Sequence, residues 1–134
     1  MEYIYSSFAR QAFMHTLGAS LELVERGRVH IAMPFSEHLL QQHGYVHAGV
    51  VTSIADSASG YAALTLAPSG SEVLSVEFKI SLLAPARGQR FLARAEVIHA
   101  GRRLSFCTAE VAAIDGADEQ IIAMMLSTMR VRTA

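Results

Sequence analysis

The sequence is poor in residue types on which whole classes of protein depend. Its 134 residues include no tryptophan and one cysteine, and only 17% are charged. Because a single cysteine cannot form an intrachain disulfide, the fold has no disulfide framework. Cys107 lies in an alternating apolar run without an indicated histidine partner, so we predict a small buried hydrophobe rather than a nucleophile. A net charge of −1 and a pI near 6.6 do not fit the basic surface of a nucleic-acid-binding protein.

Targeting and membrane signals are also lacking. Residues 1–5 show neither a basic n-region nor an apolar h-region, so no signal peptide is predicted. The longest stretch of low charge, residues 38–71, is rich in Gly, Ala, Ser and Thr rather than Leu. It also carries Asp56, whose charge would be costly in lipid. We therefore expect a cytoplasmic protein that has neither a membrane nor a nucleic acid as partner.

No linker, repeat or low-complexity tract divides the chain, and its length fits one domain over residues 1–134. A chain of this size can bury roughly two-thirds of its unfolded surface. Hydrophobic residues make up 51% of the sequence. Small domains with so much apolar surface often cover part of it with another subunit, so we expect a homo-oligomer.

Hydrophobic periodicity predicts helices first and a long sheet afterwards. A short N-terminal helix is expected over residues 6–17, with Ser6 or Ser7 as N-cap and Gly18 as its end. A hairpin follows over residues 19–33, and then a helical turn over residues 37–42. A long helix is expected over residues 48–66. Alternating apolar and polar residues predict further strands over residues 75–82, 90–99, 104–114 and 120–132.

These elements predict an α+β architecture. Short turns between the strands imply antiparallel pairing. A helix of about 18 residues is about 27 Å long, so a strongly twisted sheet could curl around it. The long helix consists almost entirely of small or apolar residues, which is typical of a helix buried on all sides.

Asp56 is the exception within this helix. It is the only Asp, Glu, Lys or Arg between Glu37 and Glu72. An isolated carboxylate in an apolar setting is costly without a partner, and such acids are functional-site candidates. The alternative is a structural Asp that bonds to the backbone or to a nearby hydroxyl group of the helix; the candidates are Thr52, Ser53, Ser57 and Ser59.

The predicted start of the helix offers a second chemical feature. The first N–H groups of a helix lack internal partners and carry positive dipole character, so they can bind a developing oxyanion. Ala48 would supply such a group, but Asp56 lies eight residues on, about 12 Å by helical rise. One subunit cannot place both groups on one carbonyl. A two-fold-related neighbour could bring its own Asp56 near this Ala48, provided that the reaction is acyl transfer.

Several segments together resemble the PaaI-like hotdog-fold acyl-CoA thioesterases. The motif in that family is Asn, then Gly three residues on, then His-Gly-Gly, then an acidic residue on the helix. It is matched by Gln41–Gly49 (QQHGYVHAG) and Asp56–Ala62 (DSASGYA). Leu74–Gly88 and His99–Arg103 resemble the third strand and the following hairpin of the family. The resemblance spans residues 23 to 131 and implies a hotdog fold, a long antiparallel sheet wrapped around one central helix.

The resemblance also implies roles for individual residues. Asp56 would be the nucleophile or general base that acts on the thioester carbon, directly or through water. The Ala48 N–H would polarise the thioester carbonyl, and His47 would order the loop. Gln41 stands where the family has Asn, which positions the water or thioester, and Ser75 stands where some members have a Ser that assists the water. Two departures matter: Ala48 replaces a Gly, and Gln41 is one methylene longer than Asn.

Further positions are expected to bind the substrate: Gly49 at the helix start, Tyr61 in the acyl pocket, and Arg87, Arg102 and Arg103 at the phosphates of coenzyme A. Each prediction has a simpler alternative. His47 could order its loop without catalytic duty, Gln41 could be a turn residue, Ser75 could face solvent, and the two adjacent arginines could form a solvated turn. The spacing of His38, His43 and His47 fits no zinc pattern, so no metal is expected.

The resemblance implies hydrolysis of a small, medium-chain or aromatic acyl-CoA by a homotetramer built as a dimer of dimers. No cofactor is expected, since coenzyme A is part of the substrate. One alternative is a hotdog hydratase, which needs an Asp–His arrangement; here no histidine follows Asp56 until His99. The other alternative is a non-catalytic acyl-CoA binding module.

Overall fold

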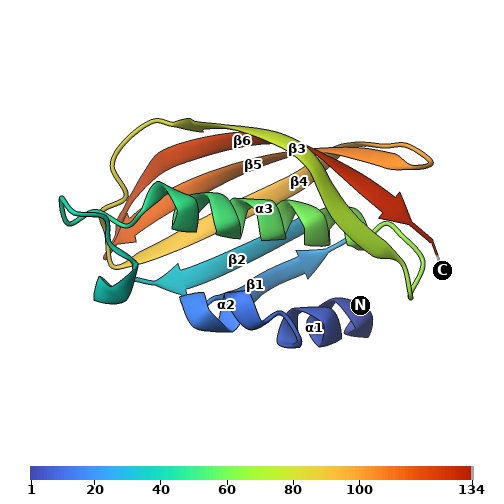
Figure 1. Ribbon diagram of the computed structural model, residues 1–134, viewed down its shortest axis with the longest axis horizontal. Helices are drawn as coiled ribbons and strands as arrows, with labels where there is room; N and C mark the ends of the chain where they lie inside the picture. The colour runs from blue at the N-terminus through green and yellow to red at the C-terminus, as the bar shows by residue number, and fades with distance from the viewer. Residues whose placement is uncertain (134) are drawn as a thin grey trace.

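The computed structural model describes residues 1–133; Ala134, the last residue of the expected domain, lies outside them. Three helices and six strands follow one another along the chain (Figure 1). In order they are α1 (Glu2–Ala9), α2 (Ala12–Leu17), β1 (Ser20–Glu25), β2 (Arg28–Pro34), the 3-10 turn η1 (Glu37–Leu39), α3 (Ala48–Leu64), β3 (Glu72–Leu82), β4 (Arg90–Ala100), β5 (Leu104–Asp115) and β6 (Asp118–Arg132).

The strands form one antiparallel sheet in the order β1-β2-β4-β5-β6-β3. The sheet curves behind α3, which crosses its concave face, while α1 and α2 lie beside β1 (Figure 1). After α3 the chain crosses to the far edge, so β3 has β6 as its partner on one side and a free edge on the other. The predicted hotdog fold, an antiparallel sheet around one central helix with helix at the N-terminus, is confirmed.

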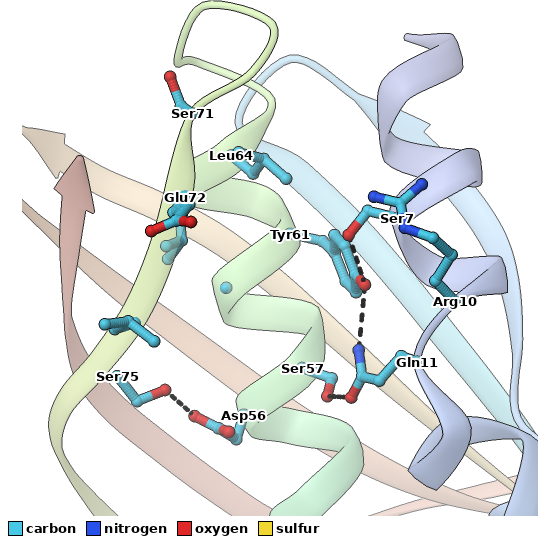
Figure 2. A pocket seen from close by; sticks show the side chains of 13 residues that line it. Ser7, Arg10, Gln11, Asp56, Ser57, Tyr61, Leu64, Ser71, Glu72 and Ser75 are labelled. Atoms are coloured by element: carbon cyan, nitrogen blue, oxygen red, sulfur yellow. Dashed lines mark hydrogen bonds between the residues drawn. The ribbon is translucent and has the colours of Figure 1, made fainter. Parts of the chain in front are cut away.

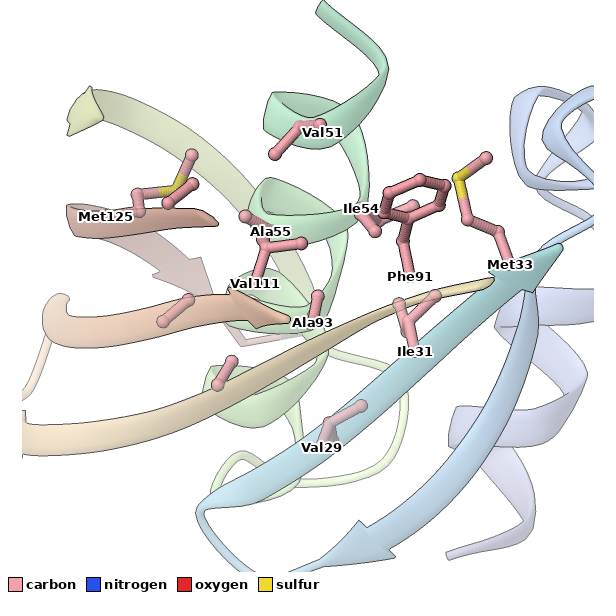
Figure 3. Close-up of a cluster of buried hydrophobic side chains, with 14 of the residues drawn as sticks. Val29, Ile31, Met33, Val51, Ile54, Ala55, Phe91, Ala93, Val111 and Met125 are labelled. Atoms are coloured by element: carbon pink, nitrogen blue, oxygen red, sulfur yellow. The ribbon is translucent and has the colours of Figure 1, made fainter. Parts of the chain in front are cut away.

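The core lies between α3 and the sheet (Figure 3). Ala55, Ala58 and Ala62 are fully buried on the helix. Their small side chains let the backbone of the sheet approach closely, and larger residues on the strands fill the space that remains. Those strand residues include Val29, Ile31, Phe91, Val111 and Met125. This packing fixes the rotation of α3, and hence which of its residues face away from the sheet.

The expectation that α3 is buried on all sides is wrong. One stripe of the helix remains partly or fully open: Gly49, Thr52, Ser53, Asp56, Ser57 and Gly60. These positions recur at intervals of three and four residues, so they share one face. The helix is therefore amphipathic, and its polar face consists of Gly, Ser and Thr with one charged residue. Asp56 is half-buried on that face rather than enclosed in the core.

The single N-terminal helix expected over residues 6–17 is two helices. The backbone at Gln11 is extended (φ −85°, ψ 96°), which ends α1 and starts α2. Neither Ser6 nor Ser7 is an N-cap; Met1 and Gln11 take those positions. The predicted end at Gly18 is confirmed, because Gly18 adopts the left-handed conformation (φ 68°) that terminates a helix.

Two apolar surfaces of the sheet remain exposed in the single chain. Along β3 at the free edge, Val76, Phe78 and Leu82 are 57%, 43% and 55% exposed. On the face of the sheet away from α3, exposed side chains alternate with buried ones; the large apolar ones there are Leu104, Phe106, Met124 and Leu126. None of the helices within residues 1–133 is long and apolar enough to cross a membrane.

Candidate active site

The carboxylate of Asp56 is held by a serine from the edge strand. Ser75 Oγ on β3 donates to Asp56 Oδ1 at 2.5 Å (Figure 2). A β-bulge between Ser75 and Glu77 interrupts the pairing of β3 with β6 beside this contact. Bulges re-aim side chains locally, which places the serine toward the helix although it stands on an exposed strand. One carboxylate oxygen is thereby occupied and the other is free of protein donors among the described residues.

The hydroxyl groups of α3 do not donate hydrogen bonds to Asp56. Thr52, Ser53 and Ser59 donate to the carbonyl groups of Ala48, Gly49 and Ala55, each four residues earlier. Ser57 instead donates to the Gln11 side chain at 3.1 Å. The structural alternative, in which a helix hydroxyl satisfies the acid, is therefore wrong for all four candidates. The partner of Asp56 comes from 19 residues away in sequence, and local spacing could not predict it.

The start of α3 leaves one N–H group open. His47 is the N-cap, and its Nδ1 accepts from the N–H of Gly49 at 2.8 Å. The N–H groups of Val50 and Val51 donate to the His47 carbonyl. The N–H of Ala48 makes no hydrogen bond within residues 1–133. A side chain on Gly49 would meet His47 Nδ1 at 3.0 Å, so glycine allows the imidazole to cap this closely. The predicted loop-ordering contact of His47 is present.

The loop before the helix is closed by Gln41. Its Oε1 accepts from the N–H groups of His43 (2.6 Å) and Tyr45 (3.2 Å), and its backbone N–H donates to the Tyr45 carbonyl (2.8 Å). Arg87 packs over the Tyr45 ring, 5.2 Å from its centroid, and donates to the phenolic oxygen at 3.1 Å. Gln41 thus acts as a turn residue through its oxygen, while its amide nitrogen has no partner in the described chain.

Two cavities lie at opposite ends of β3. The first, here the acid cavity, has a volume of about 500 Å³ and is lined by Ser7, Arg10, Gln11, Asp56, Ser57, Gly60, Tyr61, Leu64 and residues 71–75. The second, here the loop cavity, has a volume of about 570 Å³ and is lined by Gln41, Tyr45, Val46, His47, Ala48, Val51, Ile122 and residues 82–86. Both volumes lie in the range of small-molecule sites. Asp56 and Ala48 therefore belong to different cavities of one chain.

The three arginines expected to bind coenzyme A do not lie together in one chain. Arg87 precedes β4, and Arg102 and Arg103 follow it, so they lie at opposite ends of an 11-residue strand, roughly 35 Å apart. The Arg102–Arg103 turn is at the same end of the sheet as Ser75, because Ser75, Met129 and Ser105 are in register across β3, β6 and β5. Arg87 is at the loop-cavity end, where the Ala86 carbonyl accepts from Val46 N–H.

Sequence reasoning missed the wall that the N-terminal helices contribute to the acid cavity. Ser7, Arg10 and Gln11 line it, and Ser7 and Gln11 bond to Tyr61 and Ser57 of α3 (Figure 2). Their spacing of three and four residues was the available signal. The sequence did not reveal that this face packs against Ser57 and Tyr61 of α3, because that placement depends on tertiary contacts.

Two other groups are accounted for. Cys107 is buried as predicted, and burial raises the pKa of its thiol to about 11, so it is protonated at neutral pH. Residues 1–133 contain no cluster of three histidine, cysteine or carboxylate side chains that could hold a metal ion.

Comparison with known proteins adds independent information. A family model described as the thioesterase superfamily matches residues 43–119. A protein with a proposed esterase activity from Saccharolobus solfataricus is 31% identical over 107 residues, which cover 80% of this chain and 69% of that protein. The 1,4-dihydroxy-2-naphthoyl-CoA hydrolase of Listeria monocytogenes is 29% identical over 87 residues, 65% of this chain and 71% of that enzyme.

Solved structures agree with the sequence matches. A thioesterase family protein from Silicibacter pomeroyi superposes with a TM-score of 0.97 at 44% identity, covering 99% of this chain and 98% of that one. The PaaI protein of E. coli, from the phenylacetic acid degradation operon, superposes with a TM-score of 0.88 at 20% identity, covering 99% and 92%. The second likeness concerns the fold alone.

Proposed function

This chain belongs to the thioesterase superfamily and is a thioester hydrolase with the hotdog fold, and we propose that it hydrolyses a small, medium-chain or aromatic acyl-CoA with Asp56 and the Ala48 N–H. In this reaction an oxygen nucleophile adds to the thioester carbon, the C–S bond breaks, and the products are a carboxylic acid and free coenzyme A thiol. The observation that carries the proposal is the presence of an available carboxylate and an unpartnered helix N–H in two cavities that border the same edge strand.

Asp56 has the environment of a reactive carboxylate. Ser75 holds one oxygen, and the other faces the acid cavity. In the direct route the free oxygen attacks the thioester carbon, the thiolate leaves, and water then hydrolyses the mixed anhydride at the Asp56 carbonyl to release the acid. In the other route the free oxygen takes the proton of a water that attacks the thioester carbon, and this proton passes to the departing sulfur. A single turnover in ¹⁸O water separates the two routes: label enters the product acid at once if water attacks, and enters Asp56 first if the carboxylate attacks.

The Ala48 N–H can stabilise the negative charge that develops on the thioester oxygen. An N–H at the first position of a helix is unpaired and lies at the positive end of the helix dipole. Charge that develops on the thioester oxygen is stabilised by such a fixed donor. His47 keeps the donor in place because its imidazole occupies the next N–H, that of Gly49. The free amide nitrogen of Gln41 lines the same cavity and is placed to hold the thioester or a water.

A two-fold dimer through β3 would unite the two groups. The acid cavity borders the first half of β3 and the loop cavity borders its end. Antiparallel pairing of two β3 edges about their midpoint, near Phe78, sets the first half of one strand against the second half of the other. Asp56 of one subunit would then meet Ala48 of the partner. The exposed Val76, Phe78 and Leu82 on an unpaired edge strand support this pairing.

The same pairing would gather the separated arginines. Arg102 and Arg103 lie at the Ser75 end of their own subunit, and Arg87 lies at the end that the partner would contribute. We assign these arginines to the phosphates of coenzyme A. The second apolar surface, around Phe106 and Leu126 on the outer face of the sheet, provides the contact that turns two dimers into a tetramer.

The test is thiol release from a panel of short, medium, long and aromatic acyl-CoAs. Asp56→Asn keeps the shape of the side chain and removes its charge, so kcat should fall by at least 100-fold. Asp118→Asn, an exposed acid at the start of β6, is the matched control and should retain full activity. Binding of acyl-CoA by wild type without turnover on any ester would replace this proposal with a non-catalytic binding module.

Complementation tests the shared site. Ala48→Pro removes the N–H donor, and Asp56→Asn removes the acid, so each homo-oligomer should be inactive. A mixed dimer of the two variants contains one site with neither change, because the site combines Asp56 of one subunit with Ala48 of the other. Co-expressed variants should therefore regain about a quarter of wild-type activity on statistical mixing. No recovery in a mixed dimer verified by mass would show that each site belongs to one chain.

A further inference from the structure

Four neutral side chains form a continuous hydrogen-bond network along one wall of the acid cavity (Figure 2). Gln11 Nε2 donates to the Tyr61 hydroxyl at 3.0 Å, and Ser57 Oγ donates to Gln11 Oε1 at 3.1 Å. The hydroxyl groups of Ser7 and Tyr61 lie 3.1 Å apart and share a third hydrogen bond. The network joins α1 and α2 to α3, and its two members on α3 leave the helix on a different side from Asp56 (Figure 2).

This network holds more donor hydrogens than it uses. The three hydroxyl groups carry one each and the Gln11 amide carries two, whereas the network contains only three hydrogen bonds. Two donor hydrogens are left over, and this holds for either orientation of the Gln11 amide, since the number of hydrogens does not change. The wall can therefore donate to a ligand oxygen.

A positive charge stands beside these donors. Arg10 lines the cavity, and its guanidinium bonds to the backbone carbonyl and hydroxyl of Ser6 at 3.1 and 2.7 Å. None of the ion pairs in residues 1–133 engages Arg10. The carboxylate on the opposite wall, Glu72, pairs with Arg132 at 3.2 Å. The N-terminal wall is thus cationic, and the nearby anion has a separate partner.

The position of the network relative to Asp56 sets the length of the ligand. Tyr61 lies five residues beyond Asp56, about 7.5 Å along the helix axis, and Ser57 is adjacent to Asp56. Successive residues turn about 100° around a helix, so an acyl chain that joins a thioester carbon at Asp56 to the Tyr61 hydroxyl also passes around α3, over Ser57 and Gly60, which line the same cavity. Both side chains line one cavity of about 500 Å³, and this volume limits the length of the acyl chain.

We propose that the acyl group carries a carboxylate at the end remote from the thioester, so that the substrate is the coenzyme A monothioester of a short dicarboxylic acid. This rests on the proposed function, in which Asp56 acts on the thioester carbon. The remote carboxylate accepts the two spare hydrogens of the network and meets the Arg10 charge, which is the strong form of hydrogen bond. A methyl group at the same place would remove water from these donors without replacing its hydrogen bonds.

The experiment compares acyl-CoAs of matched length that differ only at the far end: glutaryl against pentanoyl and adipoyl against hexanoyl. Wild type should have kcat/KM at least tenfold higher for the carboxylated member of a pair. Arg10→Gln should lower kcat/KM about tenfold for the carboxylated esters, chiefly through KM, and leave the alkyl esters within twofold. Tyr61→Phe should act in the same direction. Arg26→Gln, an exposed arginine in the β1–β2 turn, is the matched control.

Three results would overturn the inference. The first is equal or better turnover of the alkyl esters by wild type. The second is a loss in Arg10→Gln that is the same for both members of each pair, which would place Arg10 at a phosphate of coenzyme A. The third is a Tyr61→Phe variant, folded by circular dichroism, with unchanged preference. Failure of the proposed function is a separate outcome: no ester of either kind would be hydrolysed, or Asp56→Asn would retain turnover.

Discussion

Ser75 Oγ donates a 2.5 Å hydrogen bond to Asp56 Oδ1, and this bond joins the free edge strand of the sheet to its central helix. The residues are far apart in sequence, and they belong to the two elements that would face the partner subunit. A change in the position of β3 is therefore transmitted directly to the carboxylate. The proposed dimer would fix β3, and with it the orientation of the acid.

Ser75→Ala should lower kcat about tenfold with a smaller change in KM, since a hydrogen bond to a charged group is lost but the carboxylate remains. Steady-state kinetics on the best acyl-CoA would measure this. Ser81→Ala, an exposed serine on the same strand, should be neutral. A Ser75→Ala enzyme with wild-type kcat would reduce this serine to a structural contact.

Ala48→Pro should lower kcat by 100- to 1000-fold while the protein stays folded, because it removes one oxyanion donor. Proline suits the first position of a helix, and His47 already has the extended backbone (φ −59°, ψ 138°) that is favoured before proline. Ala48→Ser is the control, since it keeps the N–H. The measurement is kcat with circular dichroism of each variant; full activity in the proline variant would exclude this N–H.

Phe78→Arg should convert the oligomer to a species without β3 pairing and abolish turnover. A charge at the middle of the edge strand opposes its own symmetry mate across a two-fold axis. Light scattering gives the mass, and thiol release gives the activity. Phe13→Arg changes a residue of similar exposure on α2 and should alter neither. An active monomer would contradict the shared site.

The acid side of the stability curve should depend on His30. Burial lowers the pKa of His30 below 6.5, and the charges of Arg28 and Arg94 act in the same direction. As the pH falls through 6.5, the unfolded chain therefore binds this proton first, and the free energy of unfolding decreases.

His30→Gln removes this titration, so the variant should lose less stability than wild type between pH 7.5 and pH 5.5. Urea unfolding at the two pH values measures the difference. His43→Gln removes an imidazole from an exposed loop and is the comparison. A wild-type pH dependence in His30→Gln would assign the acid sensitivity to other groups.

Much of the fold followed from local pattern. Alternation of apolar and polar residues predicted five of the six strands to within two residues at either end, and small apolar residues predicted the central helix from Ala48. The N-terminal helix was harder. Ser6 and Ser7 have the chemistry of N-caps. The hydroxyl of Ser7 instead shares a hydrogen bond with that of Tyr61, and the break between α1 and α2 falls at Gln11. Tertiary contacts decided that boundary.

The sequence by itself determined which chemical groups are available: one acid on an otherwise uncharged helix, and an N–H at the first position of that helix, with His47 before it and Gly49 after it. Only the tertiary structure decided what surrounds them. The partner of Asp56 is Ser75 rather than a helix hydroxyl, Arg87 is remote from Arg102 and Arg103, and Ser7, Arg10 and Gln11 form one wall of the acid cavity. Local spacing fixes neighbours within a helix, whereas strand order and helix rotation depend on how the whole core packs.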